Sequence, residues 1–354
     1  MARWKYRFGI PLVGAAVALG AASLTPALTN AQTPLLQPMS ASQLIAAVIG
    51  AAPVQYSGQL QITSNILGSD ASLLSSVGQG VALPEGTSQV MVYRGAGADL
   101  RLQEINAQSE RDLYVNSAGA WSWNSANTSA EHVAFGSSTQ QSSSMQQMNP
   151  TEMADALVGR LAPTSDVTVG ANTYVAGHAA YTLSLAPLQA GSTISSVRIF
   201  VDAKNYHVLA VSVNSVYSSS PVLQMGYQSI TFTDPSTSNF AFTPPTGATV
   251  KTVTTAQLQA MFDPMSTSTK PVTLGTSWQT VDELPATLLG QLSSSIGAKG
   301  LAELETPVVL ANGETAESIH TALFNLLVLP NNGPILAGAV RGSVLESDAG
   351  VLGF

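Results

Sequence analysis

The sequence has no cysteine, and only 10% of its 354 residues are charged, against about 25% in an ordinary soluble domain. Without cysteine there can be no disulfide bond, no thiolate metal site, no catalytic thiol and no lipidated cysteine. Ser and Thr together outnumber the charged residues about twofold, so hydroxyl groups make up much of the polar surface. Because such a surface has few carboxylates, its charge changes little when they become protonated at low pH. The composition therefore favours an acidic external milieu.

Basic residues are also scarce: 13 Lys and Arg against 21 Asp and Glu leave a formal net charge of −8. Nucleic acid is therefore excluded as a partner, because phosphate binding needs a basic stripe. The length predicts one large or two ordinary domains, and a hydrophobic content of 45% suffices for a buried core.

Residues 1–31 have the pattern of a secretory signal peptide. Arg3, Lys5 and Arg7 precede an apolar stretch over 10–24, and small residues end the segment. The chain is therefore expected outside the cytoplasm, secreted or in the cell envelope. The alternative is an uncleaved membrane anchor, although the apolar stretch is short for a span of about 20 residues.

Most of the chain that follows has the pattern of antiparallel strands. Apolar and polar residues alternate in short runs rich in Val, Ile, Tyr and Thr, with turn residues between them. No helices alternate with these runs, so a parallel sheet with crossover helices is excluded. The predicted strands are 55–65, 89–95, 99–105, 111–116, 120–124, 131–135, 166–169, 179–185, 195–201, 207–216, 222–234 and 240–243.

Two short helices are predicted beside these strands. Ser40 and Gln43 have capping-box spacing, apolar residues follow on one face, and Gly50 ends the helix. The second helix is predicted over 150–161, after a Ser/Gln-rich stretch. Because two short helices cannot cover the apolar face of so many strands, three arrangements remain besides a fully packed sandwich. The sheet curls on itself, it packs against the last hundred residues, or it keeps an apolar cavity for a ligand.

Motifs for catalysis and metal binding are absent. The sequence has no Gly-x-Ser-x-Gly, Ser-x-x-Lys or His-Glu-x-x-His motif and no phosphate-binding Gly-Lys-Ser/Thr loop. His132, His178, His207 and His320 do not have the spacing of metal ligands. We therefore predict no enzymatic activity, no metal site and no cofactor.

Several segments occur in an order and spacing that resemble a known family. They are RDLYV at 111–115, AWSWN at 120–124, the helix at 150–161, YVAGHAAYTL at 174–183, VRIFVD at 197–202 and FAFTPP at 240–245. Together they resemble the extracytoplasmic LolA/RseB-like superfamily, which contains lipoprotein carriers and regulators of sigma factors. The resemblance is closest to exported proteins of high-GC Gram-positive bacteria (actinobacteria).

This resemblance implies a mainly β (α+β) fold over residues 32–250. The expected architecture is a curved antiparallel half-barrel of about eleven strands, with short plug or lid helices and an apolar cavity. Residues 251–354 lie outside the family pattern and are expected to form an appended α+β region, as a small domain or as extra strands that close the cavity. In this region helices are predicted over 255–262 and 284–296, strands over 307–311, 321–329 and 335–341, and a hairpin turn at 332–333.

The resemblance also implies a site. In the carriers an arginine on the barrel holds the lid helix, a role expected here of Arg94 or Arg101, with pairing to Glu104 or Glu110 in solvent as the alternative. For the two tryptophans the alternative to lining the cavity is plain core packing. The expected ligand-binding residues are Leu60, Ile62, Val90, Val92, Leu100, Leu102, Leu113, Val115, Trp121, Trp123, Ile199 and Val211.

Three functions are compatible with this sequence. The first is an exported, non-enzymatic carrier or binding protein that holds a lipid or a lipoprotein acyl chain in the cavity. The second is an RseB-like envelope sensor that uses the same cavity to regulate a membrane-bound partner. The third is a structural envelope protein with a packed core and no ligand.

Overall fold

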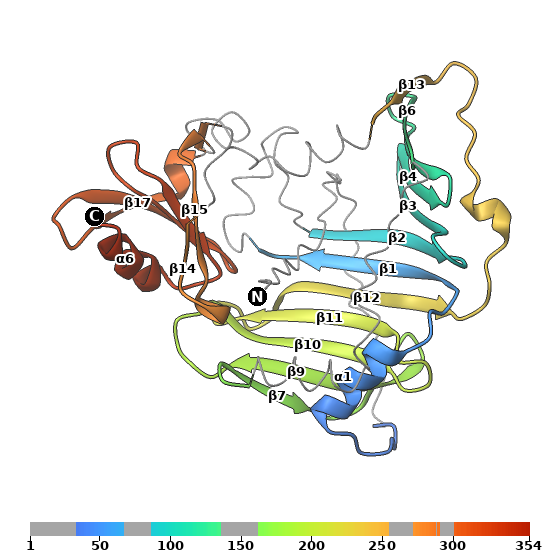
Figure 1. Cartoon of the computed structure of the whole chain (residues 1–354), viewed down its shortest axis with the longest axis horizontal. Coiled ribbons are helices and arrows are strands. Elements are labelled where there is room, and N and C mark those ends of the chain that lie inside the picture. The colour runs from blue at the N-terminus through green and yellow to red at the C-terminus, as the bar shows by residue number, and fades with distance from the viewer. Residues whose placement is uncertain (1–32, 67–85, 136–161, 255–271, 288, 291–300) are drawn as a thin grey trace, which may run out of the picture.

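The computed structural model describes residues 33–66, 86–135, 162–254, 272–287, 289–290 and 301–354. The predicted signal peptide, the Ser/Gln-rich stretch and the helices predicted over 150–161 and 255–262 lie outside these residues. The described chain is mostly β and forms two sheets, one of thirteen and one of six strands (Figure 1).

The larger sheet is curved and does not close on itself (Figure 1), which confirms the predicted fold class. Its strands follow the order β13-β6-β5-β4-β3-β2-β1-β12-β11-β10-β9-β7, and β8 pairs with β9. All pairs are antiparallel except that of β13 with β6. In chain order the strands are β1 (Tyr56–Ser64), β2 (Gly86–Arg94), β3 (Leu100–Asn106), β4 (Ser109–Asn116), β5 (Gly119–Asn124), β6 (Ser129–Ala134), β7 (Ser165–Val169), β8 (Thr173–Val175), β9 (His178–Pro187), β10 (Ile194–Asp202), β11 (Val208–Ser215), β12 (Pro221–Thr231) and β13 (Thr249–Thr252).

The strand predicted over 240–243 is wrong. Thr237–Phe240 forms the 3-10 helix η3, and the residues after it form no strand before β13, with a turn at Thr246 and Gly247. Pro244 and Pro245 explain the difference, because proline cannot donate to a strand ladder. In Figure 1 this segment passes along the outer side of the curve made by β3, β4 and β6.

Strand register divides the side chains of the large sheet into two faces. Ile62 lies opposite Met225, Met225 opposite Val211, and Val211 opposite Ile199, so these four residues share one face. We call it the inner face, because the first helix packs on it. The other face is the outer face.

The helix α1 (Ala41–Gly50) begins with the predicted capping box. Gln43 N donates to Ser40 Oγ at 3.2 Å, and Ser40 N donates to Gln43 Oε1 at 2.8 Å. Leu44 and Ile45 are 0% and 6% exposed, and α1 lies over the last strands of the sheet (Figure 1). These two side chains share a buried cluster with Tyr181, Leu183 and Val201, to which Val167, Val169, Leu185 and Ile199 add partly buried contacts.

The described residues between 273 and 351 form the smaller sheet and a helix packed on it. The strand order is β14-β15-β19-β18-β17-β16. Leu345 and Ala349 of the helix are fully buried in a core with Val281, Leu327 and Leu336. The elements are β14 (Thr273–Leu274), the 3-10 helix η4 (Ser277–Gln279), β15 (Val281–Leu284), β16 (Glu305–Val309), β17 (Thr315–His320), β18 (Asn325–Val328), β19 (Ile335–Gly338) and α6 (Gly342–Val351).

The predictions for this region are partly confirmed. A hairpin turn joins β18 to β19, but its central residues are Asn331 and Asn332, with φ of 58° and 56°, one position before the predicted 332–333. The single strand predicted over 321–329 is wrong, because 321–324 is the turn between β17 and β18. The helix predicted from Leu284 is wrong at its start, since Leu284 ends β15, and α6 was not predicted.

The two sheets meet at the loop between β9 and β10. Thr193 is fully buried and donates from N to Ala339 O at 3.0 Å and from Oγ1 to Leu323 O. Ser192 Oγ donates to Ala339 O at 3.0 Å. Leu323 also packs on Ile66, beside the large sheet. We call this junction the seam; its residues are Ile66, Ser192, Thr193, Leu323 and Ala339.

Candidate functional site

Ten of the twelve predicted ligand-binding residues lie on the inner face. Register connects them: Leu60 pairs with Val90, Val92 with Leu102, and Leu113 with Leu102. The ten residues come from six strands, β1 to β4, β10 and β11. They are Leu60, Ile62, Val90, Val92, Leu100, Leu102, Leu113, Val115, Ile199 and Val211.

Most of this apolar surface is only half-buried. Val92 is 4% exposed, but the other nine of these side chains are of intermediate exposure. Within the described part of the chain, several apolar residues of the inner face belong to no buried cluster. They include Ile62, Leu113, Val115, Val197, Val211, Leu223 and Met225.

Charged side chains are confined to one end of the inner face. Glu104 and Arg111 pair across β3 and β4, and burial raises the pKa of Glu104. Arg94 ends β2 on the same face, opposite Leu100. From β1 through β12, β11, β10 and β9 to β7, the inward positions of the strands carry no Asp, Glu, Lys or Arg. Six strands at about 4.8 Å spacing make this uncharged strip about 24 Å wide.

Trp121 and Trp123 lie on the outer face, so the expectation that they line the inner cavity is wrong. Trp121 pairs with Tyr114 and Trp123 with Asp112, whereas the neighbours Leu113 and Val115 point inward. The two rings pack against Phe242, at centroid distances of 5.5 and 5.9 Å. Both tryptophans therefore pack against neighbouring side chains, which was the alternative to lining the cavity.

Phe240 and Phe242 fasten the segment after η3 to the outer face. Phe240 is 4% exposed, and a Cβ on Gly95 would lie 2.7 Å from its ring. Phe242 stacks on Tyr114, and Asn116 Nδ2 donates to Phe240 O at 3.3 Å. We call Phe240 to Phe242 the outer latch. In the sequence, this segment appears as two aromatic residues two positions apart, followed by two prolines. That pattern alone does not distinguish a segment packed on the sheet from a strand within it.

The two arginines expected to hold a lid lie on opposite faces of the sheet, Arg94 on the inner and Arg101 on the outer face, and a lid-holding role for either stays a prediction. Arg94 donates to carbonyl groups of its own hairpin turn, Gly97 O at 2.8 Å and Asp99 O at 3.5 Å. Arg101 lies on the outer face, where Nε and Nη2 each lie 3.2 Å from Asp112 Oδ1. Its Nη2 is also 3.6 Å from Glu110 Oε1, the alternative partner. The lid helix predicted over 150–161 lies outside the described residues.

Asp112 is the most buried charge of this outer network. Its side chain is 2% exposed, against 16% for Arg101. Tyr114 OH also donates to Asp112 Oδ2 at 3.2 Å. Burial raises the pKa of Asp112 to about 6, although the Arg101 guanidinium lowers it, and burial raises the pKa of Tyr114 to about 12. The network holds β3 to β4.

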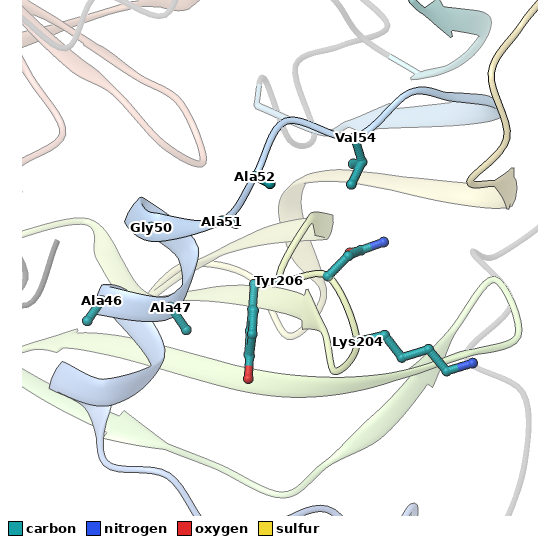
Figure 2. Close-up of a pocket in the computed structure, with 9 residues that line it drawn as sticks. Ala46, Ala47, Gly50, Ala51, Ala52, Val54, Lys204 and Tyr206 are labelled. Atoms are coloured by element: carbon teal, nitrogen blue, oxygen red, sulfur yellow. The ribbon is translucent and has the colours of Figure 1, made fainter.

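Two surface depressions lie beside the turn between β10 and β11. One, of about 580 Å³, separates this turn from the end of α1 (Figure 2). In Figure 2 the ring of Tyr206 stands beside the helix, and Lys204 extends away from it. The other, of about 440 Å³, is lined by His178, Asp202 and Phe232 and shares Lys204 with the first. Neither is lined by a predicted ligand-binding residue.

The four histidines lie in four separate environments. His132 stacks on Trp121, and His320 Nε2 lies 3.1 Å from Ser318 Oγ. His178 Nδ1 is 3.1 Å from Asp202 Oδ2. His207 packs among tyrosine rings, and burial lowers its pKa. Among the described residues no three His, Asp or Glu side chains come together in a way that could hold a metal ion.

In the described ranges no helix is both long enough and apolar enough to cross a bilayer. The chain matches no protein-family model and no curated protein.

Solved structures similar to this chain include three of interest. The complex of MucA and MucB from Pseudomonas aeruginosa has 13% identity and a TM-score of 0.42, covering 87% of this chain and 96% of the other. A LolA superfamily protein from Nitrosomonas europaea has 12% identity and a TM-score of 0.22, covering 58% and 99%. An uncharacterized conserved protein from Thermus thermophilus has 8% identity and a TM-score of 0.35, covering 60% and 99%.

The MucB and LolA superfamily neighbours agree with the LolA/RseB-like fold that the sequence resemblance implies. The closer resemblance to actinobacterial proteins stays a prediction.

Proposed function

We propose that this chain is an exported, non-enzymatic binding protein that holds the acyl chain of a lipid or lipoprotein against its inner face. The observation that supports this proposal is the uncharged strip, where the part that α1 leaves uncovered, on β1, β12 and β11, keeps apolar side chains such as Ile62, Met225 and Val211 half-buried. An acyl chain would cover them without needing a hydrogen-bond partner. Selection would then act on the length and shape of the chain rather than on polar groups.

Burial of methylene groups supplies the affinity. Each buried CH₂ contributes about 0.8 kcal/mol, so ten of them contribute about 8 kcal/mol before the cost of immobilising a flexible chain is subtracted. Ile62, Val211 and Met225 form a continuous apolar row for such a chain. At one end of the row, Ile199 contacts α1, which limits how far the chain can extend.

The test is ligand binding by wild type and by variants of the inner face. We expect native mass spectrometry to find a co-purifying amphiphile, and a fluorescent fatty acid to bind the delipidated protein. Val211→Asn should weaken that binding about tenfold, because a polar amide in an apolar site costs about 1–2 kcal/mol. Val250→Asn, at an exposed position on β13 (48% exposed), is the matched control and should bind like wild type.

Failure of this experiment has a definite meaning. If no amphiphile co-purifies and the fluorescent fatty acid does not bind, the proposal is wrong and a packed structural protein is the better description. If the acid binds but Val211→Asn has no effect, the ligand lies elsewhere, and the depression between α1 and Tyr206 becomes the next place to test.

A sensor that regulates a membrane-bound partner is the second candidate. One observation favours it: Val213 of the inner face packs on the cluster that contains Leu323 of the smaller sheet. A ligand on the inner face would therefore lie next to the seam. Hydrogen exchange of the smaller sheet, measured with and without bound fatty acid, distinguishes a carrier from a sensor. In a simple carrier, the bound fatty acid should leave the exchange rates of the smaller sheet unchanged.

A further inference from the structure

Exposed apolar side chains border the seam. Val216 is 40% exposed and Tyr217 54%, in the turn after β11, and Phe324 is 43% exposed in the turn between β17 and β18. The two turns are held close together, because Thr193 O accepts from Val216 N at 2.8 Å while Thr193 Oγ1 donates to Leu323 O. Phe324 and Tyr217 thus belong to one rim, on both sides of a buried threonine.

Hydrogen bonds hold the backbone of this rim in place. Asn325 is fully buried and donates from Nδ2 to Val340 O at 2.7 Å. Ala322 N donates to Ile66 O at 2.7 Å, and Tyr217 N donates to Ser215 Oγ at 3.0 Å. Because these bonds fix the backbone on either side of the exposed rings, the rings cannot fold into the core without breaking buried hydrogen bonds.

Among the described residues, the segments that form the rim carry no charged side chain, and Arg341 lies at their border. Residues 187–197, 205–233 and 321–340 contain no Asp, Glu, Lys or Arg, although the whole chain carries a formal −8. Arg341 follows directly and is exposed; its backbone N donates to Gly191 O at 2.7 Å, next to the seam. Aromatic rings, hydroxyl groups and an arginine are the side chains that favour the headgroup region of a bilayer.

The rim is also continuous with the inner face. Val213 and Ile194 pack on the cluster of Ile66, Val222 and Leu323, and Val213 lies opposite Val197 in the inner-face register. An apolar path therefore leads from the rim to the uncharged strip. No charged residue of the intervening strands β10 and β11 points inward along it.

We propose that the rim formed by Val216, Tyr217, Phe324 and Arg341 docks on a phospholipid bilayer. The rings would insert at headgroup depth, and the Arg341 guanidinium would bind lipid phosphate. Docking there would place the uncharged strip next to the bilayer, where an acyl chain can leave or enter. The docking surface does not depend on the acyl-binding proposal, and the two can fail separately.

Vesicle co-sedimentation tests the rim. We expect wild type to pellet with phosphatidylcholine vesicles, and more strongly when phosphatidylglycerol is included. The double variant Tyr217→Ser/Phe324→Ser should lose about tenfold in vesicle affinity, because two rings no longer enter the interface. Arg341→Gln should lose about fivefold, and mainly with phosphatidylglycerol vesicles. Phe135→Ser, at a position that is 42% exposed at the end of β6, is the matched control and should pellet like wild type.

Three outcomes would overturn the proposal. Wild type that pellets with neither kind of vesicle excludes the bilayer as the occupant. A double variant that pellets like wild type places membrane binding elsewhere on the molecule. A dimer of wild type that the double variant abolishes, without any vesicle binding, identifies a second copy of the chain as the occupant. If the double variant binds fatty acid like wild type, the inner face binds its ligand independently of the rim, whichever of these outcomes is found.

Discussion

The ring of Phe242 stacks on the ring of Tyr114, with 4.9 Å between centroids and 26° between the ring planes. The two residues are far apart in the sequence, since Tyr114 is in β4 and Phe242 follows β12. Their contact closes the outer latch over β4 and β5. The latch holds the part of the sheet that lies farthest from α1.

The first prediction concerns this latch. Phe242→Ala should lower the free energy of unfolding by about 1–3 kcal/mol, because the ring is half-buried and contacts Tyr114, Trp121 and Trp123. Chemical denaturation followed by tryptophan fluorescence measures the change. Phe135→Ala removes the same group from an exposed site and should cost less than about 0.5 kcal/mol. Equal losses in the two variants would show that the latch adds no stability.

The second prediction concerns pH and Asp112. Its pKa is about 6 in the folded chain, above the ordinary value of 3.8. The folded state therefore binds more protons than the unfolded state in this range, and the free energy of unfolding should rise as the pH falls from about 6 to about 4. Asp112→Asn should flatten this rise, measured by denaturant titrations across that range. Burial also raises the pKa of Glu104, so a smaller rise of the same sign should remain.

Asp234→Asn is the control for these measurements, because Asp234 is exposed in the segment that follows β12. It should leave the pH dependence as in wild type. Stability that falls on acidification toward pH 4 in wild type would contradict the assignment of a raised pKa to Asp112. It would equally contradict the acidic milieu that the sparse charge of the sequence favours.

Strand positions could be predicted because alternation is a local signal. The strand predicted over 207–216 is found at Val208–Ser215, and the capping box of Ser40 and Gln43 forms as its spacing indicates. Faces could not be predicted strand by strand, since alternation alone does not say which of the two apolar or aromatic rows points inward. Trp121 and Trp123 were therefore assigned to the wrong face.

The hairpin turn held the missing information. Asn116 pairs with Gly119 across a two-residue turn, and that register places Trp121 opposite Tyr114 and away from Leu113. A prediction that counted register from the turn would have put both tryptophans outside. The helix α6 carried a weaker signal: it begins at Gly342 without a side-chain cap, and its apolar positions are few. Its formation depends on the tertiary core that buries Leu345 and Ala349.

The third prediction concerns the seam. Thr193→Val keeps the shape of the side chain but removes the donor to Leu323 O, leaving a buried carbonyl without that partner. The free energy of unfolding should fall by about 1–3 kcal/mol. Thr168→Val, at an exposed position on β7, is the matched control and should change it by less than about 0.5 kcal/mol. If Thr193→Val is as stable as its control, the hydroxyl does not hold the two sheets together.

The fourth prediction concerns the attachment of α1 to the inner face. Leu44 is fully buried against the cluster of Tyr181, Leu183 and Val201. Leu44→Ala should therefore lower the free energy of unfolding by about 2–5 kcal/mol, through lost burial and the cavity left behind. Ile49→Ala, in the same helix but 37% exposed, separates this packing effect from a general loss of helix stability and should cost less than about 1 kcal/mol.

Because α1 bounds one end of the uncharged strip, hydrogen exchange of β9 and β10 should also accelerate in Leu44→Ala and not in Ile49→Ala. Unchanged exchange in these strands would mean that the helix packs on the sheet without protecting it.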